Sequence, residues 1–354
     1  MKCIDIVLEV WLSGRKRHPA KVLAGVIWSI GSNPIASAYI NNINMNDNKT
    51  ALVIICDDKY LSNNYGFTCL KSFLYNNKWF NGDIIFFDDG EFFTISNDNK
   101  TKLKSLYNKI IFKKINFNTY KWLIDLFSFN NIDFYQNYEF IHCIKRNLKL
   151  LKAYPKFEIF NLKEYDKILC IDADILFVDN VKELFNKDIS FGVTSSLYYN
   201  SQNIKLQDIK DINSFRKNND LIEFDSGGFN SGVIYIGNKN LLNGNITNEI
   251  LEFCKEKQLN INNKKYPVYF FDQCIFNYFF TEKYNDFVTF ISPIYNMCIA
   301  KFTIFNSVDE ECLSDFYKEL KEHSKIWHFL YKPLQLNKNH YYKKVWNNYK
   351  DMTL

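Results

Sequence analysis

The chain has 354 residues, of which 47% are hydrophobic and 23% charged, and its formal net charge is only +5. This composition is typical of a globular protein that buries a large core. Basic and acidic residues are interleaved along most of the chain, which argues against nucleic acid as the main partner. The nine cysteines form no CxxC pair, so a reducing compartment is favoured over a disulfide scaffold or a zinc ribbon.

The amino-terminal segment, residues 1–44, differs in composition from the rest of the chain. Five basic and two acidic residues lie within its first 40 positions, and the apolar run 22–30 is followed by Ala36-Ser37-Ala38, as in secretory signals. The apolar run is short for a signal and far too short to span a bilayer. We expect instead an extension that is disordered or not natively translated, and we assign it no catalytic role.

From residue 51 onward, short apolar runs alternate with segments of helical period. Strands are expected at 51–56, 83–87, 168–171 and 233–236, and helices at 67–75, 141–151, 181–185 and 247–257. Continuous apolar strands of this kind are typical of parallel sheets that are covered on both faces. The order predicts an α/β core over residues 50–300, in which residues 91–140 and 198–222 are variable insertions.

Two aspartates directly follow the predicted strand at 168–171, in the triplet Asp172-Ala173-Asp174. Residues i and i+2 of an extended chain project to the same side, so the two carboxylates point toward one place. Ligands bind beyond the carboxyl ends of parallel strands, and a divalent cation such as Mn²⁺ or Mg²⁺ would relieve the repulsion between the carboxylates. A solvated turn at a strand end is the simpler interpretation of the triplet alone.

The segment around this triplet, residues 165–176, strongly resembles the metal-site segment of glycosyltransferase family 8. Four further segments resemble motifs of that family in the family's order, at 55–60, 229–234, 271–277 and 327–329. The resemblance covers about residues 50–335 and implies an α/β, GT-A (Rossmann-like) fold with a mixed, mostly parallel sheet flanked by helices. We expect a single domain at 45–335, followed by a basic, aromatic C-terminal extension at 336–354.

The resemblance also implies roles for individual residues. The metal ligands would be Asp172, Asp174 and His328, with Mn²⁺ as the expected ion, and imidazole is a reasonable third ligand beside two carboxylates. Asp272 would contact the sugar hydroxyls, and Gln273 would lie beside the anomeric carbon. The donor-binding residues would be Asp57, Tyr60, Lys156, Asn230, Ser231 and Lys332.

Several of these residues also have simpler structural interpretations. His328 could be a packed neighbour of the aromatic residues beside it, and Lys156 could be an ordinary surface lysine. Asp272 could cap a helix. Asp57 could belong to a turn, and Tyr60 could belong to the core.

A member of this family is expected to transfer a hexose from a UDP-sugar with retention of configuration. The expected neighbour of the anomeric carbon, Gln273, is an amide, which favours front-face attack over a covalent intermediate on a carboxylate. Lys156 and Lys332 would add positive charge at the diphosphate. The sequence departs from the family after His328, where the glycine before the Lys-Pro pair is absent and leucine replaces tryptophan. Lys332 lies in this departing segment, so its expected phosphate contact has the weakest support from the resemblance.

The expected acceptor is a glycan or a lipid-linked glycan of cell-surface polysaccharide or lipopolysaccharide biosynthesis. The scattered cysteines favour the cytoplasm, and the basic, aromatic tail predicts peripheral contact at the inner face of the membrane, unless the tail is a solvated helix. Two other classes stay open. A sugar-nucleotide pyrophosphorylase would need a glycine-rich loop after the first strand, where residues 57–60 contain no glycine. An inactive carbohydrate-binding protein would not bind UDP in a metal-dependent way.

Overall fold

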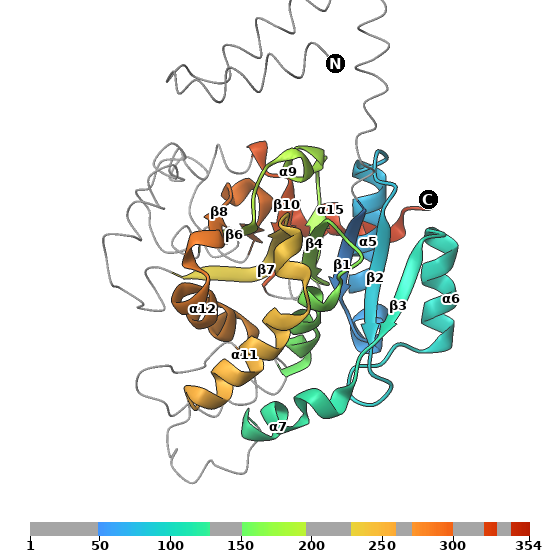
Figure 1. Cartoon of the computed structure of the whole chain (residues 1–354). Helices are drawn as coiled ribbons and strands as arrows, with labels where there is room; N and C mark the ends of the chain where they lie inside the picture. Colours follow the sequence, from blue (N-terminus) through green and yellow to red (C-terminus); the bar gives the residue numbers. More distant parts are fainter. Residues whose placement is uncertain (1–48, 128–150, 196–227, 260–270, 300–321, 331–340) are drawn as a thin grey trace, which may run out of the picture. The chain divides into compact units, whose positions relative to one another are not determined.

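Seven strands form the central sheet of the computed structural model, in the order β3-β2-β1-β4-β7-β6-β8 (Figure 1). The structure describes residues 49–127, 151–195, 228–259, 271–299, 322–330 and 341–354. The strands of this sheet are β1 (Thr50–Ile55), β2 (Asp83–Asp88), β3 (Ile110–Lys114), β4 (Lys167–Asp172), β6 (Phe191–Ser195), β7 (Phe229–Ile236) and β8 (Val288–Phe290).

Strand β7 runs antiparallel to both of its neighbours, β4 and β6, whereas the other neighbouring pairs of the sheet are parallel. The predicted mixed, mostly parallel sheet is therefore confirmed. Because β7 runs the opposite way, its first residues lie at the same edge as the last residues of β1 and β4. The register fixes this arrangement, since Ile171 pairs with Val233 and Ile55 pairs with Asp172.

A second, three-stranded sheet has the order β5-β10-β9 and consists of β5 (Ile175–Phe177), β10 (Ile326–His328) and β9 (Met297–Cys298). Strand β10 is antiparallel to β5 and parallel to β9. His328 therefore pairs with Ile175 on one side and with Cys298 on the other. This small sheet joins the turn after β4 to two segments from the carboxyl-terminal part of the chain.

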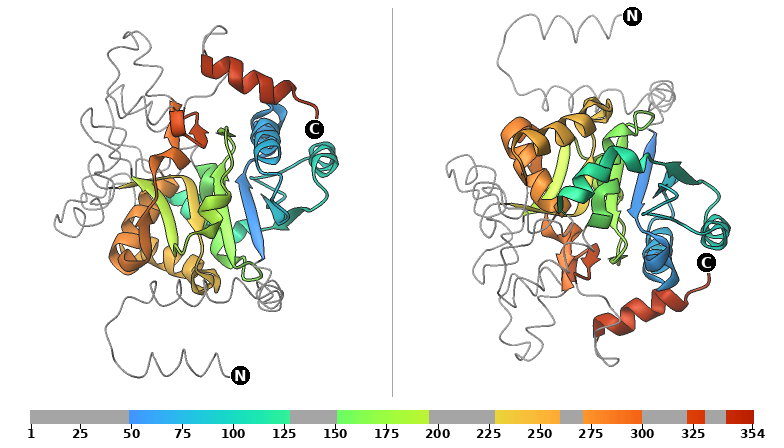
Figure 2. Two further views of the ribbon diagram at one scale, coloured as in Figure 1. Left: turned by 90° about the horizontal axis from the view of Figure 1, so that it is seen from above. Right: turned by 90° about the horizontal axis from the view of Figure 1, so that it is seen from below.

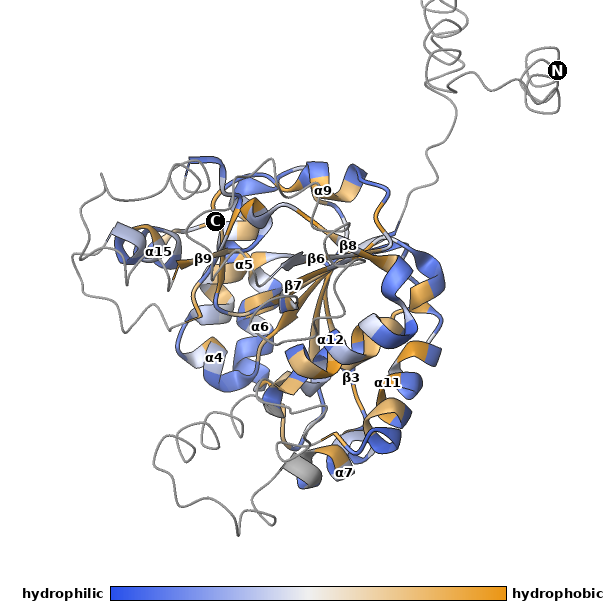
Figure 3. Ribbon diagram, turned by 90° about the vertical axis from the view of Figure 1, so that its left-hand side faces the viewer, coloured by the Kyte–Doolittle hydropathy of each residue, from blue (hydrophilic) through white to orange (hydrophobic). Residues whose placement is uncertain are grey.

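Helices cover both faces of the central sheet. Figure 2 shows α11 and α12 on one side and α5 and α15 on the other, and Figure 3 shows apolar strands between helices whose outer faces are hydrophilic. The α-helices are α4 (Asp58–Ser62), α5 (Tyr65–Asn76), α6 (Asn97–Leu106), α7 (Phe117–Phe127), α9 (Lys182–Asn186), α11 (Asn245–Glu256), α12 (Phe271–Lys283) and α15 (Tyr341–Asp351). The 3₁₀ helices are η2 (Leu151–Asn161), η5 (Lys239–Leu242), η6 (Asn285–Phe287) and η7 (Pro293–Tyr295).

The strands expected from continuous apolar runs are confirmed as β1, β2, β4 and β7, and the helices expected at 67–75, 181–185 and 247–257 are confirmed as α5, α9 and α11. The prediction that 91–140 is only a variable insertion is wrong, because α6, β3 and α7 lie within it. Strand β3 is at the sheet edge and only its first residue is buried, so its apolar run is short, three residues at 110–112 before two lysines. Residues 1–44 and 198–222, and nearly all of the helix expected at 141–151, lie outside the described residues.

The carboxyl-terminal helix α15 packs against α5 and is not a solvated extension. Trp346 is 2% exposed, and its ring lies 5.7 Å from that of Tyr65 and 5.0 Å from that of Phe329. Lys71 on α5 donates to two main-chain carbonyls at the end of α15, at 3.0 and 2.6 Å. Helix α15 thus belongs to the same compact unit as the sheet, which extends over Lys49–Leu354.

Within the described ranges, none of the helices has both the length and the apolar character that crossing a bilayer requires.

Candidate active site

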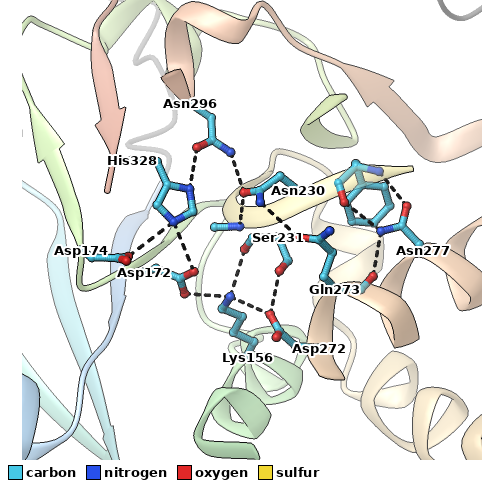
Figure 4. Close-up of polar contacts among 12 residues, drawn as sticks. Lys156, Asp172, Asp174, Asn230, Ser231, Asp272, Gln273, Asn277, Asn296 and His328 are labelled. Carbon is cyan, nitrogen blue, oxygen red and sulfur yellow. Dashed lines mark hydrogen bonds and ion pairs between the residues drawn. The ribbon is translucent and has the colours of Figure 1, made fainter. Parts of the chain in front are cut away.

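Two carboxylates and one imidazole converge at the carboxyl edge of the central sheet. Asp172 is the last residue of β4, Asp174 directly precedes β5, and His328 is the last residue of β10. One ligand atom of each residue lies within 4.8 Å of the others. His328 Nε2 is 3.4 Å from Asp174 Oδ1 and 3.9 Å from Asp172 Oδ2 (Figure 4). The three side chains that the sequence suggested as metal ligands therefore lie close together and form a candidate metal site.

The backbone holds this group together through the small sheet. His328 pairs with Ile175, the residue directly after Asp174, and the main-chain N–H of Phe329 donates to the carbonyl of Asp174 at 2.9 Å. His328 and Ile175, which are 153 positions apart in the chain (328 − 175), thereby become neighbours in one ladder. The position of the imidazole is fixed by strand pairing and does not depend on a flexible loop.

The chemistry of these three side chains fits a divalent cation. Carboxylate oxygens are the hard ligands that Mg²⁺ and Mn²⁺ prefer, and imidazole also suits Mn²⁺. Ligand atoms that each lie about 2.0–2.6 Å from one ion are at most about 5 Å apart, and the separations within this group fall inside that limit. The His328 side chain is 3% exposed while those of Asp172 and Asp174 are 28% and 20% exposed, so the group is open to solvent on its acidic side.

Lys156 is a buried cation beside this group. Its side chain is 2% exposed, and Nζ lies 2.7 Å from Asp172 Oδ1 and 2.7 Å from Asp272 Oδ2. Burial alone would lower the pKa of Lys156, but the charges of Asp172 and Asp272 outweigh it and raise that pKa well above the ordinary value. Lys156 is therefore permanently charged, and the interpretation of it as a surface lysine is wrong.

Asp272 lies in the first turn of α12 and faces the same cation. Its Oδ2 accepts hydrogen bonds from Lys156 and from Ser231 Oγ, the latter at 2.7 Å. Lys156 also donates to the main-chain carbonyl of Ser231 at 3.2 Å. The carboxylate of Asp272 thus connects α12 to the first residues of β7, beyond any role in capping its own helix.

Gln273 is held in place by two asparagines. Asn230 Nδ2 donates to Gln273 Oε1 at 3.1 Å, and Asn277 Nδ2 donates to the main-chain carbonyl of Gln273 at 2.7 Å. The Asn277 side chain also accepts from the N–H of Phe229 at 2.7 Å and donates to its carbonyl at 2.8 Å. These bonds lock the first half of α12 against the start of β7.

Asp57 and Tyr60 lie at the end of β1, the strand next to β4. Asp57 is 3% exposed; it caps α4 by accepting from the N–H of Tyr60 at 3.0 Å, and it forms an ion pair with Lys152. Burial raises the pKa of the Tyr60 phenol, and the nearby charges of Asp174 and Asp172 raise it further. The Tyr60 phenol is therefore within electrostatic range of Asp172 and Asp174, whereas Asp57 already has partners within the protein.

The structure connects most of the predicted site residues in one network, and Lys332 lies outside the described residues. The connected residues are Lys156, Asp172, Asp174, Asn230, Ser231, Asp272, Gln273 and His328.

Two residues of this region were not found from the sequence. Lys152 pairs with Asp57, and Asn296 lies behind His328, whose Nδ1 is 3.0 Å from Asn296 Oδ1. Asn296 directly follows a turn that contains proline, where asparagine is common, so its residue type gives no signal. Lys152 lies four residues before Lys156 in η2, and this spacing gave no signal in the sequence.

A mostly parallel sheet of this order, with a candidate cation site at its carboxyl edge beside a buried lysine, is the architecture of the GT-A fold. The model of glycosyl transferase family 8 matches residues 51–348, and the chain belongs to this family. It is a glycosyltransferase, which excludes the alternative of a sugar-nucleotide pyrophosphorylase. No curated protein matches the chain in sequence.

Solved structures of glycosyltransferases share the fold at low sequence identity. The galactosyltransferase LgtC in complex with donor and acceptor sugar analogs is 17% identical, with a TM-score of 0.53, over 85% of this chain and 95% of that chain. A second structure of LgtC, with the same identity and TM-score, is an active-site mutant in which glutamate replaces glutamine. GlyE of Streptococcus pneumoniae TIGR4 is 15% identical, with a TM-score of 0.54, over 87% of this chain and 61% of that chain. The bifunctional glycosyltransferase WbbM is 18% identical, with a TM-score of 0.55, and this chain spans about half of its length.

Proposed function

We propose that the protein transfers a hexose from a UDP-sugar to a glycan or a lipid-linked glycan, with retention of configuration and with Mn²⁺ or Mg²⁺ as cofactor. The observation that carries this proposal is the convergence of Asp172, Asp174 and His328 within 4.8 Å, directly beside the buried cation of Lys156. A site that combines metal ligands with a fixed positive charge is suited to a diphosphate leaving group.

The donor would lie along the carboxyl edge of the sheet. Asp57 and Tyr60 at the end of β1 would contact the uridine, and Asn230 and Ser231 at the start of β7 would line the sugar pocket. Lys332 would contact a phosphate. The order of the strands supports this assignment, because β1, β4 and β7 are adjacent and their relevant ends share one edge.

The principal electrostatic demand of the reaction is the negative charge that develops on the leaving diphosphate. A divalent cation held by Asp172, Asp174 and His328 would act as a Lewis acid on that diphosphate. Lys156 supplies a second positive charge that needs no proton uptake, because its pKa is raised. Its bonds to Asp172 and Asp272 keep the ammonium group in place before the donor binds, which limits reorganisation during the reaction.

The chain's own side chains favour front-face attack over a covalent glycosyl intermediate. Gln273 carries an amide, which is a much weaker nucleophile than a carboxylate. The residue before it in the chain, Asp272, carries a carboxylate that accepts hydrogen bonds from Lys156 and Ser231 and would orient sugar hydroxyls. The active-site mutant of LgtC replaces a glutamine, which supports a role for an amide in this fold.

The proposal also includes the acceptor of the sugar and the location of the protein. We assign the protein to cell-surface polysaccharide or lipopolysaccharide synthesis in the cytoplasm, with peripheral contact at the inner face of the membrane. Trp346 and Tyr342 of α15 are buried against the domain and are not free for that contact. Tyr341, which is 56% exposed, and the exposed Lys344 would make it instead.

The test is donor hydrolysis with Mn²⁺ across a panel of UDP-sugars, together with calorimetry of UDP binding. We expect slow hydrolysis of at least one UDP-hexose, and loss of both UDP binding and hydrolysis in Asp174→Ala. The alternative of an inactive carbohydrate-binding protein predicts no metal-dependent UDP binding. A wild-type protein that neither binds UDP with Mn²⁺ nor hydrolyses any donor would overturn the proposal.

A further inference from the structure

A chain of side-chain amides links the metal histidine to Gln273. Asn296 is fully buried and lies between His328 and Asn230, with Thr194 beside it. Asn296 Nδ2 is 2.9 Å from Asn230 Oδ1 and 2.9 Å from Thr194 Oγ1. Asn230 in turn contacts Gln273 (Figure 4). Asn296 is the one member of this chain that has no role in the proposed reaction.

The direction of each hydrogen bond among these side-chain amides follows from one backbone group. The main-chain N–H of Gly232 can only donate, so the Asn230 atom that lies 2.9 Å from it must be the carbonyl oxygen Oδ1. The Asn296 atom 2.9 Å from that oxygen must then be the donor Nδ2. The remaining polar atom of Asn296 is Oδ1, which can only accept, and it faces His328 Nδ1 at 3.0 Å.

The protonation of the His328 ring is thereby determined. Because Asn296 Oδ1 accepts, the proton of a neutral imidazole lies on Nδ1, and the lone pair lies on Nε2. Nε2 is the nitrogen that faces Asp174 at 3.4 Å and Asp172 at 3.9 Å. A partner at the second ring nitrogen is the usual device by which proteins orient a metal-binding histidine.

The same reasoning gives the direction of the hydrogen bond between Asn230 and Gln273. With Asn230 Oδ1 accepting from both Gly232 and Asn296, Asn230 Nδ2 is left to donate to Gln273 Oε1. The orientation of the Gln273 carboxamide is therefore coupled to the tautomer of His328 through Asn296.

We propose that Asn296 is a positioning residue, which fixes the tautomer and ring plane of His328 and, through Asn230, the orientation of Gln273. The claim about His328 stands on geometry alone, whereas the claim about Gln273 rests on the proposed transferase function. The two amide atoms of Asn296 divide these tasks, because Oδ1 serves the histidine and Nδ2 serves Asn230.

Two substitutions of Asn296 test these two tasks separately. Asn296→Leu removes both the acceptor and the donor, so the His328 ring loses its orientation. Asn296→Asp keeps an acceptor for Nδ1–H but places an oxygen against Asn230 Oδ1, so only the arm toward Gln273 is lost. Asn77→Leu is the matched control, because Asn77 is also buried and hydrogen-bonded but lies at the end of α5 away from the site.

The first measurement is the tautomer of His328 in the metal-free protein, by long-range ¹H–¹⁵N NMR of ¹⁵N-histidine-labelled chain. The chain has only five histidines, and the imidazole signals that are missing from the spectrum of His328→Gln are those of His328. We expect the Nδ1–H tautomer in wild type, in Asn296→Asp and in Asn77→Leu, and a mixture of tautomers in Asn296→Leu. An Nε2–H tautomer in wild type, or an unchanged tautomer in Asn296→Leu, would overturn the proposal.

The second measurement is Mn²⁺ affinity, from the free-ion signal in electron paramagnetic resonance, with Mn²⁺ alone as the probe. Asn296→Leu should weaken binding about tenfold or more, while Asn296→Asp should bind Mn²⁺ as well as wild type or better. With a UDP-sugar that the wild-type protein uses as substrate, Asn296→Asp should lower kcat about tenfold without a matching change in KM. Equal Mn²⁺ affinity in Asn296→Leu and wild type would contradict the proposal. A protein that turns over no donor but keeps the Nδ1–H tautomer would refute the proposed function and leave the role of Asn296 toward His328 intact.

Discussion

The two carboxylate oxygens of Asp172 face different partners. Oδ1 lies 2.7 Å from Lys156 Nζ, whereas Oδ2 faces His328 Nε2 at 3.9 Å. The side chain can therefore keep its bond to the ammonium group and still offer an oxygen to a cation. Lys156 offsets part of the acidic charge of the site, so the metal-free protein tolerates two carboxylates beside Asp272.

Removal of this ammonium group should make the protein depend more strongly on metal. Lys156→Met leaves Asp172 and Asp272 without their buried partner, which should cost about 3 kcal/mol in the free energy of unfolding of the metal-free protein. Mn²⁺ then restores part of the missing positive charge, so the rise in Tm on adding Mn²⁺ should exceed that of wild type. Differential scanning calorimetry measures both effects. The exposed Lys102→Met serves as control and should stay within about 0.5 kcal/mol of wild type. A rise in Tm no larger than that of wild type would contradict this role.

Gly232 should tolerate no side chain, because the His328 ring lies directly over it. A Cβ at this position would lie 2.7 Å from His328 Nδ1 and closer still to the ring carbon Cε1. Gly232→Ala should therefore displace the imidazole and weaken Mn²⁺ binding about tenfold, measured by the free-ion signal. Gly192→Ala on β6 is a matched control, since a Cβ there would meet only side-chain carbons of Ile189, Ile291 and Tyr235, at 3.1–3.3 Å. Wild-type affinity in Gly232→Ala would show that the imidazole is not a ligand.

Trp346 should support the site from behind. Its ring contacts Phe329, the residue after His328, and Tyr65, whose ring lies 5.7 Å from that of Tyr60. Trp346→Ala should lower the free energy of unfolding by about 3–5 kcal/mol in urea denaturation. We also expect weaker binding of Mn²⁺ and UDP in the fraction that remains folded. Tyr341→Ala, at an exposed position of the same helix, should change neither quantity measurably. A folded Trp346→Ala protein with wild-type binding would limit α15 to a purely structural role.

The stability of the protein should respond to acid through Asp58. Burial by itself would raise the pKa of this carboxyl, but hydrogen bonds from the Ser96 N–H and hydroxyl and from Asn99 outweigh it and lower the pKa. A lowered pKa in the folded state stabilises the protein above the unfolded value of about 3.9, and this contribution is lost as pH falls through the folded pKa. Asp58→Asn should cost about 1 kcal/mol between pH 5 and 7, and the difference from wild type should shrink below pH 4 in urea titrations. A difference that stays constant down to pH 3 would exclude this linkage.

Sequence reasoning found the parts of the fold in which each strand is a continuous apolar run. Strands β1 and β4 are buried on both faces, and such runs leave a clear signal. The edge strand β3 has no such signal, because most of its residues are half-buried or exposed. The direction of β7 is also invisible, since eight buried residues look the same in either orientation.

The predicted metal ligands could be found because the spacing of Asp172 and Asp174 itself carries the geometry. The burial of Lys156 could not be predicted, because it depends on two carboxylates from distant elements that meet only in the folded chain. Asn296 gave no signal for the same reason, because its side chain bonds to His328, Asn230 and Thr194, which lie at least 32 residues away.

The most direct test of a shared cation at Asp172, Asp174 and His328 is a crystal structure of the protein with Mn²⁺ and UDP, with diffraction recorded at the manganese absorption edge. We predict one anomalous peak that lies about 2.0–2.6 Å from a carboxylate oxygen of each aspartate and from His328 Nε2. A peak elsewhere, or one at the aspartates with the imidazole beyond bonding distance, would contradict the assignment.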